Sequence, residues 1–422
     1  MTAVFRSRRA AGCQAALALA LVLATRPSPA PAETPGGTRA TGGVKISGLA
    51  ETTVSAGHSP LDGWFSGLEQ FANVRLAAPV GESGTFNAAA NLLAAAGTES
   101  AFRSDAELER LYVSFRTGRF DLDAGLMRVP FGYGQAFRPT DILNAANPLF
   151  PDARLSGVLG VLASWYLAEE TRLAAFASDR AASDLFARDY APDPLSGAGS
   201  RPLGGLLFET HAPRYSAQAL AAVRAPDSSA SVPEIRVGAS LKVEAGAGIV
   251  ADAVFFNDGE SPPSAVGSAS WVKAAFGADY SFFDGSLYVL AQYCFNGSGV
   301  LSARDSLADL YGTDDWADVP PSARVPEGGR SDYYRRHYLF AHVLWKASDY
   351  TRVGASALVA LEDGSFAPVL DLEHDLARGV SLSAEGRAYL DAGDLGLGWR
   401  GELGSANVGA TATLTCKATV RF

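Results

Sequence analysis

Apolar and polar side chains alternate from one residue to the next in many segments of this sequence. In the segment 380–390, Val380 and Leu382 fall on one face and Glu385 and Arg387 on the other. A strand turns successive side chains to opposite faces, whereas a helix returns to the same face every third or fourth residue, so this separation predicts a strand. Similar alternation recurs near residues 44–54, 70–78, 107–116, 119–128, 203–211, 235–243, 272–280, 286–296, 334–346 and 350–361. The sequence therefore predicts an all-β protein.

The alternating segments are longer than the strands of an average soluble protein. Most have about ten residues, which matches the roughly 9–11 residues of a tilted membrane-spanning strand better than the roughly five or six of a soluble one. Both faces carry many Ala, Gly and Ser residues, and only 19% of all residues are charged. The water-facing side of a soluble β-sandwich is richer in charge. We therefore expect an apolar band that faces lipid, opposite a moderately polar interior.

The connections between these segments are of two kinds. The short ones lie at 117–118, 212–213, 283–285 and 347–349, and the long ones at 129–157, 179–202, 257–269 and 297–333. From residue 107 to 346 short and long connections alternate, as they do in a barrel with short periplasmic turns and long extracellular loops. Aromatic residues near the ends of the predicted strands fit interfacial girdles; they are Trp165, Tyr166, Tyr280, Phe282, Trp345 and Tyr350. We expect a transmembrane antiparallel β-barrel.

The number of strands is less well determined than the fold. The candidate segments number 16 to 19, and a single-chain bacterial barrel has an even number of strands. With all candidates kept, the chain would end on the extracellular side, whereas a closed barrel of this kind ends inside. One segment within 70–96 or 365–403 is therefore misassigned. We expect about 18 strands, with 16 as the alternative.

The N-terminus has the three parts of a secretory signal. A basic stretch with Arg6 and Arg9 precedes an apolar run at 15–24, and small residues surround a cleavage site after Ala32. The apolar run is too short for a spanning helix, which needs about 20 residues. The predicted division of the chain is a signal peptide at 1–32, a periplasmic lead-in at 33–43 and the barrel at 44–422.

The C-terminus alternates in the same way and ends on an aromatic residue. Val420 and Phe422 lie on one side of the last predicted strand, and Thr419 and Arg421 lie on the other. This ending resembles the terminal signal by which bacterial outer-membrane barrel proteins are recognised by their assembly machinery. The resemblance implies an outer-membrane location, with that machinery and the membrane lipids as partners.

A second resemblance lies in the middle of the chain. The sequence GLMRVPFGYG at 125–134, followed by RPTDILN at 138–144, is similar to the strand-to-loop passage of porin-like outer-membrane proteins. The resemblance implies a barrel of the porin kind. Two interpretations of the segment stay open. It is a folded outer loop capped by Asp141, or it bends inward and narrows the pore.

Charged residues of both signs fall on the predicted interior face. They are Arg110, Arg116, Asp121, Asp123, Arg236, Lys242, Lys273, Asp279, Arg336, Glu385 and Arg387. Opposed charges across a narrow pore order water and select solutes by size and charge. Because barrel interiors are polar in general, each residue alone is also explained as a solvated wall residue.

These features favour an outer-membrane channel for passive diffusion of small hydrophilic solutes. A substrate-specific channel is one alternative, with Trp271, Tyr288, Tyr338 and Tyr389 as candidates for an aromatic track. A plugged structural or adhesive barrel is another. The sequence leaves open whether three copies form a homo-trimer, and it does not identify the solute.

Other classes of function find little support. The formal net charge of -10 argues against a nucleic-acid partner, which would need a basic surface. No Gly-x-Ser-x-Gly motif is present, and the five histidines lack the spacing of a metal site. The acidic stretch at 314–318 lacks the regular positions of a calcium loop. We expect no enzymatic activity, no metal and no cofactor.

Overall fold

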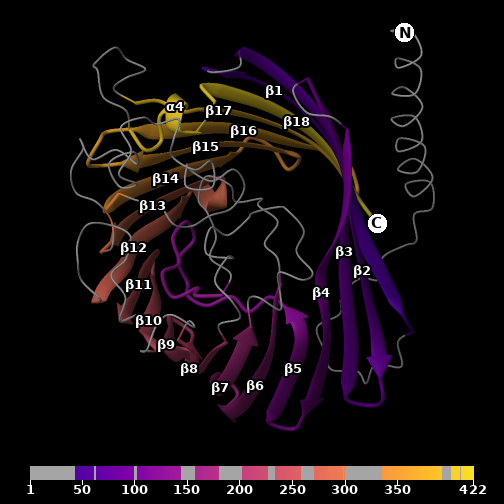
Figure 1. The fold of residues 1–422 in the computed structure, drawn as a ribbon, viewed down its shortest axis with the longest axis vertical. Coiled ribbons are helices and arrows are strands. Elements are labelled where there is room, and N and C mark those ends of the chain that lie inside the picture. The colour runs from indigo at the N-terminus through magenta and orange to yellow at the C-terminus, as the bar shows by residue number, and fades with distance from the viewer. Residues whose placement is uncertain are drawn as a thin grey trace.

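The described part of the chain forms one closed β-barrel (Figure 1). The computed structural model describes residues 43–60, 63–98, 102–143, 157–179, 202–226, 233–257, 270–297, 299, 335–391, 401–408 and 410–422. They contain an 18-stranded sheet in which every strand pairs antiparallel with its neighbours in sequence, and β1 also pairs with β18. The all-β barrel and the larger of the two strand numbers are therefore confirmed. The predicted signal peptide at 1–32 and nearly all of the lead-in at 33–43 lie outside the described residues.

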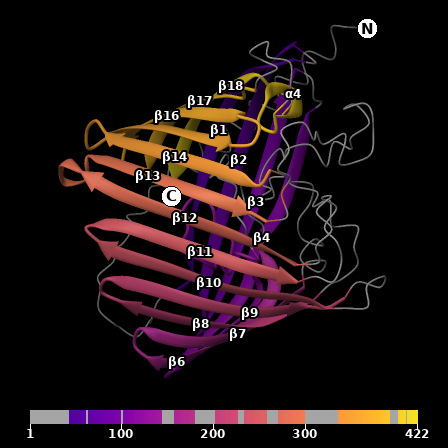
Figure 2. The ribbon, with the colours of Figure 1, turned by 90° about the vertical axis from the view of Figure 1, so that its left-hand side faces the viewer.

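The strands follow one another around the barrel in chain order. The first nine are β1 (Lys45–Ser59), β2 (Gly63–Val80), β3 (Gly84–Gly97), β4 (Arg103–Thr117), β5 (Phe120–Met127), β6 (Val158–Ala168), β7 (Thr171–Asp179), β8 (Leu203–Ala212) and β9 (Tyr215–Arg224). The others are β10 (Glu234–Ala245), β11 (Ala247–Asn257), β12 (Ser270–Phe282), β13 (Leu287–Asn296), β14 (His337–Lys346), β15 (Thr351–Ala360), β16 (Phe366–Ala377), β17 (Val380–Ala388) and β18 (Ala412–Arg421). Figure 2 shows their tilt across the wall.

The connections between residues 107 and 346 confirm the predicted alternation of short and long. Eight turns lie on one side, at 81–83, 118–119, 169–170, 213–214, 246, 283–286, 347–350 and 378–379. The turn after β12 contains a 3-10 turn, η1 (Phe283–Gly285). The chain end lies on this same side, because Phe422 and Gly48 exchange two backbone hydrogen bonds beside the turn at 378–379. Both ends of the barrel thus lie at the short turns.

The two regions in which a segment was expected to be misassigned, 70–96 and 365–403, both contain strands of the 18-stranded barrel. β3 has alanine on both faces, so its alternation is weak in the sequence, yet it pairs fully with β2 and β4. β16 is a complete strand, whereas the described residues 401–408 are not a strand and contain only a short helical turn, α4 (Ser405–Val408). At the end of the second region, the described residues 401–408 are therefore not a barrel strand.

The outer wall carries the large apolar side chains. Phe276 and Leu370 are 57% and 66% exposed, although large apolar side chains in contact with water are costly. An apolar band of this kind is suited to lipid. At the ends of strands near the short turns, Trp165, Tyr280 and Trp345 are exposed, as a girdle requires. Tyr166 differs, because it alternates with Trp165 and turns inward, next to Asp121 and Arg172. Among the described residues, no helix is long and apolar enough to cross a membrane.

Candidate pore constriction

Residues 128–143, which follow β5, fold into the barrel and lie along its inner wall. The backbone N–H of Gly132 donates to Gln218 Oε1 on β9 at 2.7 Å, and that of Tyr133 donates to Ser240 Oγ on β10 at 3.0 Å. Backbone groups away from water need partners, and the wall supplies them. The inward bend of this segment is therefore confirmed, whereas its narrowing of a pore stays a prediction. We call residues 128–143 the inner loop.

The second half of the inner loop is held by two wall residues farther along the sheet. Gln292 on β13 accepts from the backbone N–H of Ala136 at 2.9 Å and donates to the carbonyl oxygen of Phe137 at 2.7 Å. Asp252 Oδ1 on β11 accepts from the backbone N–H of Thr140 at 3.1 Å. The inner loop thus crosses the wall from β9 to β13 and thickens this side of the barrel.

Two glycines of the PFGYG sequence allow the inner loop to approach the wall this closely. Gly132 has φ +79°, a conformation that side chains other than glycine rarely adopt. A Cβ atom on Gly132 would overlap Asp252 and Thr140, and one on Gly134 would overlap the Phe137 carbonyl group. The motif that resembles porin sequences therefore encodes the docking geometry.

Apolar side chains anchor the inner loop on both sides. Phe131 is 1% exposed, and its ring lies 5.2 Å from that of Phe176 on β7. Phe137 packs in a second cluster, with its ring centroid 6.3 Å from that of Tyr338 on β14. Burial of such aromatic rings contributes about 1.5–3 kcal/mol each. The inner loop is therefore a packed part of the barrel.

Tyr133 connects the inner loop to a polar network on β7 to β9. Its hydroxyl donates to Glu209 Oε1 at 3.3 Å, and Glu209 also accepts from Arg172 and Gln218. Burial raises the pKa of the Tyr133 hydroxyl above its ordinary value of 10.0, and the negative charge of Glu209 raises it further. The hydroxyl therefore remains a donor at neutral pH.

Three arginines gather on the wall at β2, β4 and the start of the inner loop. Glu109 Oε1 lies 3.2 Å from Arg110 Nε and 3.9 Å from Arg128 Nη1. Arg75 Nε donates to Asn73 Oδ1 at 2.7 Å, and Asn73 donates to Glu109 Oε2 at 2.6 Å. Burial lowers the pKa of Arg128, and the charge of Arg110 lowers it further. We call Arg75, Arg110 and Arg128 the arginine cluster.

Of the arginine cluster, only Arg110 was among the interior residues predicted from the sequence. Arg75 lies on the polar face of its alternating segment, so the signal that would find it was present. Arg128 follows the end of β5, where alternation no longer assigns a face. Glu109 was missed because β4 has a bulge there, with Ala89 opposite Arg110 and Ala90 opposite Leu108. A bulge puts an extra residue into the strand and shifts the alternation.

The other predicted interior residues share the wall face that holds the inner loop, and several form ion pairs. Arg116 Nε lies 3.3 Å from Asp121 Oδ2, and Arg116 Nη2 lies 3.0 Å from Asp123 Oδ1. Arg387 Nη2 lies 2.7 Å from Glu385 Oε1. The structure thus brings together charges from neighbouring strands and from alternate positions of one strand.

The remaining predicted residues are distributed over β10, β12 and the segment before β14. Arg236 pairs with Glu234, and Lys242 Nζ lies 2.6 Å from Glu244 Oε1. Asp279 and Lys273 lie on the same face of β12, and Asp279 accepts from Gln135 Nε2 of the inner loop at 3.2 Å. Arg336 Nε donates to the Gly299 carbonyl oxygen at 3.1 Å. Arg236 and Arg387 are buried. That these eleven residues line a conducting pore stays a prediction.

Of the aromatic residues considered for a substrate-specific channel, Tyr288, Tyr338 and Tyr389 gather at one apolar cluster, and Trp271 is not part of it. Tyr338 and Tyr389 are buried in the cluster that contains Phe137. Trp271 stacks instead on Phe256, with ring centroids 5.1 Å apart. Within the described residues, no group of three or more His, Cys, Asp or Glu side chains is placed to hold a metal ion. The acidic stretch at 314–318 lies outside the described residues.

The chain has the fold of a closed 18-stranded antiparallel barrel, with an apolar outer wall and a loop folded against its polar inner face. Solved structures share this fold. OccAB3 of Acinetobacter baumannii matches with a TM-score of 0.50 and 12% identity over 90% of this chain and 99% of that chain. A double variant of OccD1 (OprD) matches with a TM-score of 0.54 and 10% identity, over 91% and 97% of the two chains. No protein-family model matches the sequence, and no curated protein matches it.

Proposed function

We propose that the protein is an outer-membrane channel through which small hydrophilic solutes diffuse passively. The observation that carries the proposal is the inner loop, docked by Gln218, Ser240, Asp252 and Gln292 on one wall of the barrel. A loop held in this way reduces the free cross-section of the barrel interior. Solutes can pass beside it without the loop leaving the wall. An 18-stranded barrel is wide enough to retain an aqueous channel beside such a loop.

The charged wall residues act on solutes by their field. The arginine cluster contains three positive charges beside the carboxylates of Glu109 and Asp141. Asp121, Asp123 and Glu385 place negative charges elsewhere on the same inner face. Charges of opposite sign across a confined aqueous space orient water and polar solutes. Passage then depends on size and polarity, and no chemical step is involved.

Single-channel recording in planar bilayers tests this function. We expect discrete and stable conductance steps from the folded protein, and a reversal potential under a salt gradient that gives its ion preference. A folded, heat-modifiable barrel that inserts and conducts nothing would overturn the channel and support a plugged structural or adhesive role.

The partners expected for such a barrel belong to the same proposal. Lipids surround the outer wall, and the assembly machinery acts on the strand that ends in Val420 and Phe422, which closes the barrel against Gly48 on β1. Replacement of Phe422 by serine is expected to reduce the amount of folded barrel in the outer membrane. Unchanged levels of heat-modifiable protein would contradict this role.

We also propose that three copies associate through the outer face of β1 and β2. Thr52 and Gln70 lie opposite each other on this lipid-facing side and form a hydrogen bond of 3.0 Å, beside Ala50 and Ala72. A polar amide in lipid is unfavourable, whereas between copies it is shielded, and small neighbours permit close approach. The Gln70→Leu change should shift the protein from trimer to monomer in native mass spectrometry.

The Thr210→Leu change on β8 is the matched control for the association and should leave it unaltered. A monomeric parent protein, or a trimeric Gln70→Leu variant, would contradict this interface.

A further inference from the structure

A second segment also folds against the inside of the barrel, between β17 and β18. Leu403 is fully buried and Ala410 is nearly so, and both belong to the cluster formed by the inward side chains of β13 to β16. β14 begins and β15 ends on the side of the long loops, so this cluster lies toward the extracellular mouth. We call residues 401–408 and 410 the mouth segment.

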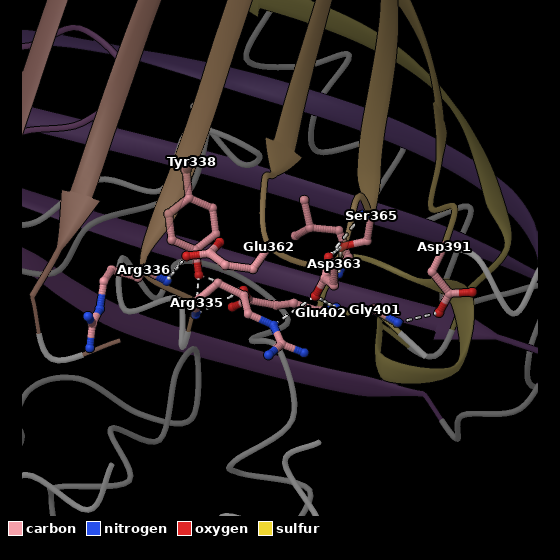
Figure 3. A network of polar contacts seen from close by, with 10 residues as sticks. Arg335, Arg336, Tyr338, Glu362, Asp363, Ser365, Asp391, Gly401 and Glu402 are labelled. Atoms are coloured by element: carbon pink, nitrogen blue, oxygen red, sulfur yellow. Dashed lines mark hydrogen bonds and ion pairs between the residues drawn. The ribbon is translucent and has the colours of Figure 1, made fainter. Parts of the chain in front are cut away.

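Asp363, in the turn between β15 and β16, holds the mouth segment through a buried carboxylate (Figure 3). Its Oδ2 atom accepts from the backbone N–H of Glu402 at 2.9 Å and from Arg335 Nε at 2.8 Å. Its Oδ1 atom accepts from the Ser365 hydroxyl at 2.6 Å. One side chain therefore connects its own turn, the entry to β14 and the mouth segment.

The Glu402 side chain of the mouth segment binds β14 and the residues just before it. Its Oε2 atom accepts from the Tyr338 hydroxyl and, at 3.2 Å, from the backbone N–H of Arg335. Glu402 and Arg335 are both 0% exposed. Buried charges are strongly destabilising unless their partners are in place, so this network favours one position of the mouth segment.

The backbone of the mouth segment is fitted to the same turn. The N–H of Leu403 donates to Ser365 Oγ at 3.0 Å, and that of Gly401 donates to Asp391 Oδ2 at 2.8 Å. A Cβ atom on Gly401 would overlap the Ser365 side chain. The contact is therefore too close for any residue larger than glycine at position 401.

Tyr338 connects the mouth segment to the inner loop. Its ring packs against Phe137 of the inner loop, and its hydroxyl binds Glu402. Phe137 and Leu403 belong to one buried cluster. The two inward segments are thus packed as one assembly against the wall of β13 to β16.

We propose that the mouth segment is a second constriction, clamped in place by Asp363, Ser365 and Tyr338, and that it sets the upper size of solutes entering the barrel. The proposal rests on the channel function and adds to it the element that limits access. When the clamp is released, the segment leaves the wall and the mouth becomes wider.

The first test adds one methyl group at position 401, where the mouth segment contacts Ser365. The Gly401→Ala change should raise the unitary conductance by about twofold and admit larger sugars in a liposome-swelling assay, because conductance and selectivity follow pore width. Gly386→Ala is the matched control, since a Cβ at this position on β17 meets open space. Its conductance should equal that of the parent protein.

A second variant removes a hydrogen bond and leaves the packing volume of the apolar cluster unchanged. Tyr338→Phe keeps the ring against Phe137 and deletes the hydroxyl that binds Glu402, so it should widen the mouth in the same direction. Heat-modifiability on gels verifies that each variant is a folded barrel. Two unlike changes with one result exclude a local packing defect.

A readout independent of conduction separates this proposal from the channel function. Ser405, which is buried in the mouth segment, is replaced by cysteine in a background without Cys13, Cys294 and Cys416. A membrane-impermeant maleimide is added from outside the membrane. It should label the thiol of the Ser405→Cys variant about tenfold faster when Gly401→Ala is also present, because local opening of the mouth segment exposes this thiol.

The outcomes are distinguishable. Faster labelling and larger conductance support the clamp. Faster labelling in a protein that never conducts overturns the channel function and leaves the clamp supported. Unchanged labelling in both folded variants overturns the clamp, whether or not the parent protein conducts.

Discussion

Single residues decide how the inner loop reaches the wall. Gly132 combines a positive φ with a position where a side chain would overlap Asp252 and Thr140. The left-handed conformation alone costs a residue other than glycine roughly 1–2 kcal/mol, and the overlap adds to this cost. The sequence showed both glycines of PFGYG, but Asp252, which Gly132 approaches, lies more than 100 residues away on β11.

Gly132→Ala should therefore loosen the inner loop and give a larger and noisier single-channel current. Gly246→Ala provides the control, because Gly246 has a φ of +86° and open space where its Cβ would lie. Gly246→Ala therefore introduces the strain of a positive φ, but its Cβ atom overlaps no neighbouring atom. An equal effect of the two changes on the current would contradict a role for the wall contact.

Tyr133 predicts a dependence on alkaline pH. Because its folded pKa is raised by burial and by Glu209, its contribution to stability is fully present below the unfolded value of about 10. It declines as the pH rises above that value toward the folded pKa. The docked inner loop should thus become less stable above about pH 10, with increasing current noise. Tyr133→Phe should remove this change, and a noise increase that persists in the variant would assign it to another group.

At the scale of elements, the arginine cluster is distributed over β2, β4 and the inner loop. Its members are separated in sequence, and the register of β2 to β5 brings them to one site. Alternation assigned faces correctly along regular strands. It failed at the bulge beside Glu109 and after the end of β5, because side-chain alternation depends on an unbroken ladder.

Arg75→Gln should shift the reversal potential toward cations, since it removes a positive charge from the inner wall. Screening reduces the effect of a charge beyond about 10 Å at 0.1 M salt and about 3 Å at 1 M, so the shift should be smaller at the higher salt concentration. Arg378→Gln, in an exposed turn, is the control. A shift of equal size in both variants would show that the cluster has no particular role.

At the scale of the whole molecule, the barrel defines an inside and an outside that no single strand possesses. Closure between β1 and β18 leaves every strand paired on both edges, as a sheet in lipid requires. The long loops on one side are then free to fold inward, and the inner loop and the mouth segment both do so. Their packing through Tyr338 makes the interior one assembly.

The sequence by itself determined the all-β class, the approximate length of the strands and the two kinds of connection. These features follow from alternation and from turn chemistry, which are local properties of the chain. Only the tertiary structure decided that Arg236 and Arg387 are buried, that Tyr338 and Tyr389 pack in a cluster, and that the mouth segment is not a strand. Those outcomes depend on contacts between residues far apart in the chain, and such contacts exist only once the barrel has closed.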